Sequence, residues 1–270
     1  MNAPLRTKPP VLLRDDLDGI ALLTLNRPQA RNSLSEALLA ALTASLADIA
    51  VDARARVVVI AANGPAFCAG HDMKEMTARR SDADRGRAYF KELMDRCAAM
   101  MQAVVRLPKP VIACVQGTAT AAGCQLVASC DLAVASSAAT FATPGVNIGL
   151  FCSTPMVALS RNVSRKAAME MLLTGDMVSA KEAQRIGLIN RVVEPGTERA
   201  AALALGRQIA AKSALTVKTG KEAFYRQLEM NLADAYRYAS DVMVENMLAR
   251  DAEEGIGAFI EKRTPSWEDR

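Results

Sequence analysis

Histidine is almost missing from this chain of 270 residues, which contains only His71. Its cysteines form no C-x-x-C pair, and zinc sites need histidine or closely spaced cysteine ligands, so we expect no metal. The cysteines lie in apolar stretches, which is typical of small buried side chains in a reducing compartment. They are Cys68, Cys97, Cys114, Cys124, Cys130 and Cys152.

Long apolar runs, aromatic residues and an excess of one charge are also scarce. No run approaches the roughly 18 apolar residues that a membrane-spanning helix needs. Aromatic residues make up 4% of the chain and the formal net charge is only +4, which argues against a nucleic-acid partner. The first residues, MNAPLRTKPP, contain no apolar stretch typical of a secretory signal. We therefore expect a cytoplasmic protein with no membrane and no nucleic-acid partner.

Strand and helix patterns alternate through the first two thirds of the sequence. Continuous apolar runs at residues 57–61 and 111–115 are typical of strands buried on both faces. Leucines at helical spacing after Ser35 predict a helix that ends near Ala50. This alternation indicates an α/β fold of stacked turns.

The composition shifts near residues 174–187, and the rest of the chain has the pattern of helices. One long helix is predicted from about residue 214 through 250. We divide the chain into a tail over residues 1–10, a core over 11–195, and a helical region over 196–270.

The most informative stretch covers residues 115–131, VQGTATAAGCQLVASCD. It has the pattern of a short buried strand, a turn of small residues, and a helix that begins near Ala122. Small residues before a helix let backbone N–H groups face a ligand. Residues 66–76, AFCAGHDMKEM, offer a second donor near His71. Residues 66–76 can be an ordinary strand-to-helix connection with an aspartate near the helix start, or their donor can pair with the one near Ala122 in a two-amide oxyanion hole.

These two segments resemble motifs of the crotonase superfamily, also called the enoyl-CoA hydratase/isomerase family. Residues 172–193, LLTGDMVSAKEAQRIGLINRVV, resemble a third motif of that family. LNRPQARNSL at 25–34 and EGIGAFIEKRTP at 254–265 resemble its terminal signatures. Each motif alone is weak, but the five occur in the family's order and together are highly specific.

The resemblance implies an α/β fold with a crotonase-like spiral of ββα turns and a C-terminal helical region for trimerisation. It implies a homotrimer or a dimer of trimers that acts in fatty acid metabolism. The substrate would be an acyl-CoA thioester, so CoA is part of the substrate and no separate cofactor is expected. The thioester carbonyl would lie between the backbone N–H groups of His71 and Ala122.

The resemblance also implies a set of residues that contact CoA. Those near the N-terminal half of the chain surround the adenine and phosphates, and the last two close over the molecule, from the same or a neighbouring subunit. The set is Gln29, Ala30, Arg31, Ala69, Asp72, Lys74, Phe259 and Lys262.

Two positions depart from the family's pattern. Hydratases of this family carry glutamates where this chain has Gln125 and Gly145. Hydration needs one carboxylate to take a proton from water and one acid to deliver a proton, and neither residue can do this at neutral pH. The chain therefore resembles a branch without both glutamates, similar to the enoyl-CoA hydratase domain-containing proteins, and its hydratase activity is in doubt.

Several alternatives stay open. The side chain of His71 can be structural or can act as an acid/base. Asn147, Ser153 and Thr154 can bind a polar acyl group or cap their loop, and residues 77–87 can be a solvated loop or a flap over the acyl pocket. The whole chain can be an enoyl-CoA hydratase-like enzyme (a lyase) or a non-catalytic acyl-CoA-binding regulatory protein.

Overall fold

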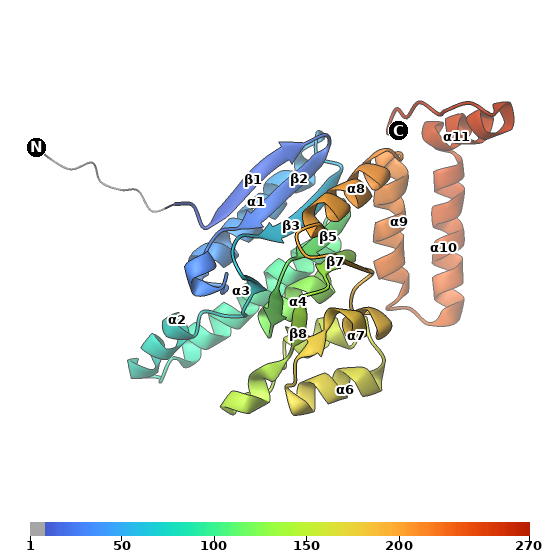
Figure 1. Cartoon of the computed structure of the whole chain (residues 1–270). Helices are drawn as coiled ribbons and strands as arrows, with labels where there is room; N and C mark the ends of the chain where they lie inside the picture. Colours follow the sequence, from blue (N-terminus) through green and yellow to red (C-terminus); the bar gives the residue numbers. More distant parts are fainter. Residues whose placement is uncertain (1–8) are drawn as a thin grey trace, which may run out of the picture.

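The computed structural model describes residues 9–270 and has the expected α/β organisation (Figure 1). Its larger sheet follows the order β1-β2-β3-β5-β7-β10. Only β1 runs antiparallel to its neighbour, and the other pairs are parallel. The strands are β1 (Leu12–Leu17), β2 (Ile20–Leu25), β3 (Val57–Ala62), β5 (Val111–Val115), β7 (Leu132–Ser136) and β10 (Arg191–Val193).

Both faces of the larger sheet are covered, which explains the continuous apolar runs in its central strands. Val58 and Ile60 of β3 pack on the side of α1 (Glu36–Val51), α3 (Arg87–Arg106) and α4 (Ala122–Ser129). Val57 and Val59 face α8 (Glu198–Ala210), which lies across the other side. Every residue of β3 is therefore buried.

A smaller sheet follows the order β4-β6-β8-β9. Its strands are β4 (Ala66–Cys68), β6 (Thr118–Thr120), β8 (Thr140–Ala142) and β9 (Val178–Ser179). Each of β3, β5 and β7 is followed by one short strand of this sheet and then by helix, which is the predicted ββα spiral. The helices after these short strands are α2 (Met73–Ala78), α3 and α4, then α5 (Pro155–Leu159), α6 (Arg165–Thr174) and α7 (Ala180–Arg185). Separate 3-10 turns lie at Pro28–Ala30, Arg79–Ser81 and Pro144–Ile148.

The C-terminal helices project to one side of the spiral (Figure 1). The predicted long helix over 214–250 is wrong, because α9 (Ala214–Gln227) and α10 (Leu232–Met247) are separate. Asn231 caps α10 by accepting a hydrogen bond from the amide of Asp234, so the chain restarts there. Every residue of α9 and α10 is exposed or half-buried.

A buried ion pair joins α9 to the spiral. Lys221 donates to the Asp131 carboxylate, with 2.7 Å between Nζ and Oδ2, and to the carbonyls of Val104 and Lys109. Tyr225 donates its hydroxyl hydrogen to the other oxygen of Asp131. All these bonds satisfy groups that would otherwise be costly to bury.

The last residues fold back after α11 (Arg250–Glu261). Asp269 accepts two hydrogen bonds from the guanidinium of Arg56, which immediately precedes β3. The ring nitrogen of Trp267 donates to the carbonyl of Ala211, and the carboxylate of Asp251 accepts the amides of residues 268 and 269. This C-terminal tail, residues 263–270, ties α11 to the spiral.

The tail predicted over residues 1–10 lies outside the described residues except for Pro9 and Pro10, which belong to no helix or strand. Among the described helices, none combines the length and apolarity that a membrane crossing requires.

Candidate functional site

The two predicted donor amides lie at the ends of two neighbouring ββ turns. Leu34 forms a parallel bridge with His71, in which its amide donates to Gly70 and its carbonyl accepts from Asp72. These two bonds use the carbonyl of Gly70 and the amide of Asp72, which flank His71 in the chain. In such a parallel bridge the N–H of His71 itself points away from Leu34. Within residues 9–270 that N–H donates to no protein acceptor.

The second amide belongs to the first residue of α4. Ala121 precedes the helix with φ 51° and ψ −119°, and its own N–H donates to the carbonyl of Ala142. Ala122 is therefore the first helical residue, with no side-chain cap and, in the described chain, no backbone acceptor for its N–H. A free amide at a helix start is suited to bind a partial negative charge.

Two glycines bring these amides together. A side chain on Gly70 would begin 3.4 Å from the nitrogen of Ala122 and 2.9 Å from the Cβ of Ala121. A Cβ on Gly123 would lie 2.0 Å from the carbonyl oxygen of Cys68. Because both positions exclude a side chain, α4 packs directly on the segment that carries His71, as an oxyanion hole requires.

Asn32 holds the loops around this point, and the sequence analysis missed it. Its side-chain oxygen accepts the amide of Arg27 at 2.8 Å. Its side-chain nitrogen donates to the carbonyls of Asn63 and Ala66, both at 2.8 Å. The residue is fully buried and every side-chain atom has a partner. Its place inside the LNRPQARNSL motif, next to a turn, was the signal available in the sequence.

Gln125 and Gly145 belong to α4 and to the 3-10 turn Pro144–Ile148. Gln125 lies one turn along α4 and is 5% exposed, and its Oε1 atom is buried without a partner. Gly145 is buried, and a Cβ there would lie 2.8 Å from the carbonyl oxygen of Leu150 and 2.9 Å from Sγ of Cys152. The site therefore has no carboxylate at either position and no room for one at Gly145 without a shift of the loop.

The histidine ring and the two thiols near the amides are uncharged at neutral pH. Burial lowers the pKa of His71 to about 4, and its Nε2 atom is buried without a partner. Burial raises the pKa of the Cys124 thiol to about 12 and also raises the pKa of Cys152. These thiols are protonated at neutral pH and are poor nucleophiles.

The predicted CoA contacts from the N-terminal half occupy one region. Gln29 and Ala30 lie in the Pro28–Ala30 turn, and Arg31 follows in a left-handed conformation. The carbonyl of Arg31 accepts the amide of Ala69, which places this turn next to the His71 segment. The side chains of Gln29 and Arg31 are exposed there.

Asp72 and Lys74 begin α2. Burial alone would raise the pKa of Asp72, but hydrogen bonds from Arg27 and the amide of Lys74 hold it below its usual range. Asp72 pairs with Arg27 at 2.9 Å, so its carboxylate already fixes the LNRPQARNSL loop. Lys74 is exposed.

Phe259 and Lys262 do not join the other predicted residues within one chain. They lie on and just after α11, on the opposite side of the molecule from α2 (Figure 1). Phe259 is 84% exposed. A role in covering CoA would therefore need a neighbouring subunit.

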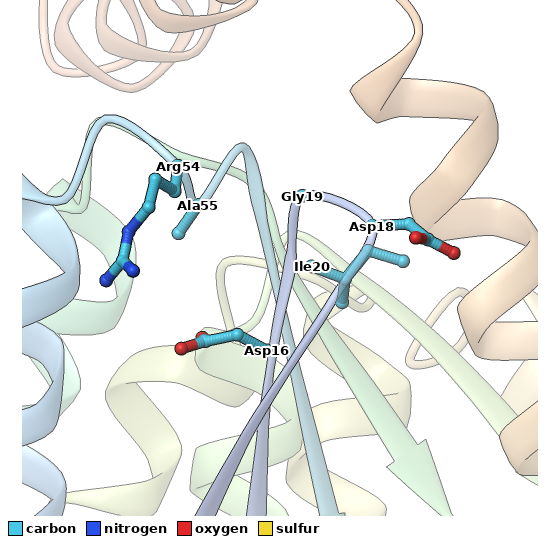
Figure 2. A pocket seen from close by; sticks show the side chains of 6 residues that line it. All are labelled: Asp16, Asp18, Gly19, Ile20, Arg54 and Ala55. Carbon is cyan, nitrogen blue, oxygen red and sulfur yellow. The ribbon is translucent and has the colours of Figure 1, made fainter.

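A shallow pocket lies away from this site, where β1 turns into β2 and at the start of β3 (Figure 2). Asp16 and Arg54 there already pair with Arg14 and Asp52 on the surface. The predicted site lies at the other ends of the parallel strands. Within residues 9–270 no group of three His, Cys, Asp or Glu side chains could hold a metal ion.

Comparisons with known proteins identify the family and the fold of this chain. The sequence profile of the enoyl-CoA hydratase/isomerase family matches residues 15–270. The chain belongs to this family, and its fold is the crotonase fold, as the motifs predicted.

Its relatives include the mitochondrial enoyl-CoA hydratase domain-containing protein 3 of Rattus norvegicus, 48% identical over 93% of this chain and 82% of that protein. The Homo sapiens protein of the same name is 47% identical over 93% of this chain and 81% of the relative. A crystal structure of the human protein, 47% identical, superposes with a TM-score of 0.91 over 95% of this chain and all of that chain. An enoyl-CoA hydratase structure from Mycobacterium smegmatis is 54% identical, with a TM-score of 0.91 over 96% and 99% of the two chains.

Proposed function

We propose that this chain binds an acyl-CoA or enoyl-CoA thioester and polarises its carbonyl between the amides of His71 and Ala122. The observation that supports the proposal is the close approach of Gly70 to the nitrogen of Ala122, together with two N–H groups, of His71 and Ala122, that donate to no protein acceptor within residues 9–270. Such a pair stabilises the enolate that forms when a proton leaves the α-carbon. Each donor is worth roughly 10² to 10³ in rate.

Efficient hydration is not part of this proposal. Gln125 cannot exchange a proton at neutral pH, and Gly145 has no side chain. Each missing acid or base lowers the rate by roughly 10² to 10⁴. We propose an enolate-stabilising member of the family with weak hydratase (lyase) activity.

The first experiment follows α-carbon deuterium exchange and hydration of varied acyl-CoAs by mass spectrometry in deuterated water. We expect exchange without efficient hydration. Ala122→Pro removes one hole donor at the first helical position, and thermal unfolding confirms that the variant is folded. The matched control, Arg165→Pro, makes the same change at the first residue of α6. Loss of exchange in Ala122→Pro alone supports the hole, whereas equal exchange in both variants overturns it.

Gln125→Glu restores one carboxylate and should raise hydration of crotonyl-CoA above that of the unmodified chain. A glutamate at Gly145 is a poorer test, because its Cβ would collide with the carbonyl of Leu150. If the unmodified chain already hydrates crotonyl-CoA at rates typical of enzymes, the doubt about hydration is wrong.

A second candidate is a non-catalytic acyl-CoA-binding regulatory protein. Gln125 and Gly145 carry no charge, and the thiols of Cys124 and Cys152 are protonated. No evident base therefore takes the α-proton, which favours a non-catalytic role. Tight binding of acyl-CoAs with no exchange and no product would select this candidate over the enzyme.

We also propose assembly as a homotrimer or a dimer of trimers through the C-terminal helices. Leu232, Tyr236 and Leu248 are at least 70% exposed on or next to α10, an unusual number of large apolar side chains for a free surface. Light scattering should give the mass of three or six chains. A monomer would overturn both the assembly and the closure of CoA by Phe259 and Lys262 from a neighbour.

The CoA contacts and the compartment are further parts of the proposal. Arg31 and Lys74 are exposed near the hole and suited to contact phosphates, so replacing either with alanine should weaken CoA binding and leave butyryl-pantetheine binding unchanged.

The six cysteines are buried and free, which supports the cytoplasm or another reducing compartment. The rat and human relatives are named mitochondrial, so cell fractionation decides between these locations.

A further inference from the structure

Four exposed arginines gather where α2 passes into α3, on the opposite side of the molecule from α10 (Figure 1). They are Arg79, Arg80, Arg85 and Arg87. Three of them line a pocket of about 470 Å³, whose wall consists of Arg80, Asp84, Arg85, Arg87 and Phe90. Like charges repel one another, so a concave surface lined by three cations calls for an explanation.

The acidic groups around this pocket do not neutralise it. The carboxylate of Asp84 accepts the amides of Gly86 and Ala88 at 2.9 and 2.8 Å, and these bonds hold the pKa of Asp84 below its usual range. Asp82 is exposed and does not line the pocket. The nearest acids of α3 pair with other cations, Asp95 with Lys91 and Glu92 with Arg96. Three arginines and one aspartate therefore leave the pocket with a charge of +2.

Two aromatic rings restrain the arginines of this turn. The guanidinium carbon of Arg80 lies 5.9 Å from the ring centroid of Phe90, and that of Arg79 lies 5.0 Å from the ring centroid of Tyr89. A cation–π contact acts through the charge of the guanidinium group. Because an arginine carries five N–H donors, most of them stay available to an anion, which the group binds with two parallel hydrogen bonds.

The backbone around Arg85 is unusual for an arginine. Arg85 has φ 58° and Gly86 has φ 83°, both in the left-handed region. A Cβ on Gly86 would lie 2.9 Å from the carbonyl oxygen of Arg79 and 3.1 Å from the ring of Phe90, so the turn packs closely on both. Glycine or asparagine would adopt the conformation at position 85 with less strain. The shape of the turn therefore does not explain why an arginine stands there.

We propose that this pocket binds the phosphate group of a small phosphorylated molecule. Arg85 and Arg87 donate hydrogen bonds to the phosphate oxygens, Arg80 adds its charge, and Phe90 contacts an apolar group next to the phosphate. A phosphate ester carries a charge of about −2 at pH 7, which matches the charge of the pocket. The pocket volume is in the range of small-molecule sites.

This site is separate from the proposed oxyanion hole. The six residues of α2 span about 9 Å between the segment of His71 and the turn that carries the arginines. The phosphate site therefore does not depend on a bound thioester.

The test is calorimetric titration of the full chain with phenyl phosphate, glycerol 3-phosphate and benzoate. We expect phenyl phosphate to bind about tenfold more tightly than benzoate, which has one charge less, and more tightly than glycerol 3-phosphate, which has no ring to contact Phe90. Arg85→Gln and Arg87→Gln should each weaken binding of phenyl phosphate about tenfold. Phe90→Leu should remove the preference for phenyl phosphate over glycerol 3-phosphate. Thermal unfolding confirms that each variant is folded.

Arg106→Gln is the matched control, because it removes the same charge from the exposed last residue of α3. It should leave the affinity for phenyl phosphate within about twofold. An equal loss of affinity in Arg106→Gln would show attraction to the whole surface and overturn the pocket, as would failure of both phosphates to bind.

Saturating butyryl-CoA tests whether the two sites are separate. It should leave the affinity for phenyl phosphate within about twofold, and competition between the two ligands would overturn a separate phosphate site. Because phenyl phosphate is also titrated without any thioester, failure of the function proposed above would not change that result.

Discussion

The spiral and the C-terminal helices bury their apolar residues in different ways. Strands such as β3 and β5 are buried along their whole length between α8 on one face and α1, α3 and α4 on the other. Helices α9 and α10 keep large apolar side chains exposed, and α10 contacts chiefly α9 and α11. The spiral therefore has a complete apolar core, whereas α9 and α10 keep large apolar side chains on the surface of the single chain.

This difference separates the proposed hole from the proposed assembly surface. All residues of the proposed hole belong to the spiral, where close backbone packing fixes them. The C-terminal helices are attached mainly by polar contacts, such as the Lys221–Asp131 pair and the C-terminal tail. Changes in the two regions should therefore have separable effects on binding and on assembly.

The largest effect is expected when the link between the regions is cut. Lys221→Met leaves the Asp131 carboxylate buried without its cation, and should lower the free energy of unfolding by about 3 to 5 kcal/mol. Lys218→Met on the exposed side of the same helix is the control and should change it by less than about 0.5 kcal/mol. Urea unfolding measures both. Equal stabilities would show that the link contributes nothing.

Close packing inside the spiral comes next. Gly123→Ala puts a Cβ 2.0 Å from the carbonyl oxygen of Cys68, so α4 must move. We expect a loss of about 2 to 3 kcal/mol in stability and weaker acyl-CoA binding. Gly220→Ala in α9 meets no atom within 4 Å and should stabilise the chain by up to about 1 kcal/mol. Thermal unfolding would confirm the contrast if the melting temperature falls in Gly123→Ala and rises in Gly220→Ala. A Gly123→Ala variant as stable as the unmodified chain would refute it.

The buried histidine of the spiral predicts a pH effect. The folded state lowers the pKa of His71 from 6.5 to about 4, so the unfolded chain takes up a proton first as the pH falls. Stability is complete above pH 6.5, decreases between pH 6.5 and 4, and loses about 3 kcal/mol in all. His71→Gln should remove this decrease. Urea unfolding at pH 7, 5 and 4 compares the unmodified chain with His71→Gln. An equal loss of unfolding free energy with falling pH in both proteins would contradict the role of His71.

The smallest effect concerns backbone strain at the hole. Ala121 has φ 51° and ψ −119°, a conformation that favours glycine and costs roughly 1 to 3 kcal/mol for alanine. Ala121→Gly should therefore raise the unfolding free energy by about 1 kcal/mol. Ala44→Gly on the exposed side of α1 should lower it by about 1 kcal/mol. Calorimetric melting should therefore show a higher melting temperature for Ala121→Gly and a lower one for Ala44→Gly.

The sequence predicted the spiral well because its signals are local. The apolar runs of β3 and β5 are typical of doubly covered strands, and the small residues before Ala122 located the start of α4. The ordered motifs identified the family. The roles of His71, Ala122 and Gly145 stay predictions, although the N–H groups of His71 and Ala122 donate to no protein acceptor within residues 9–270.

The parts that failed or were missed depend on contacts between distant residues. Apolar spacing continues through residues 228–231, so it could not reveal that Asn231 starts a new helix. Asn32 gains its role from carbonyls more than 30 positions away in the chain. No sequence pattern shows that Phe259 lies far from the hole in its own chain.

The bond between Arg56 and Asp269 spans 213 positions, which has a consequence for synthesis of the protein. The strands beside Arg56 leave the ribosome early and can pair, because most of their partners are made before residue 200. The contacts that tie α11 to the spiral can form only when residues 267–269 leave the ribosome. The nascent chain can therefore contain a packed spiral before residue 269 is made and α11 is tied to it.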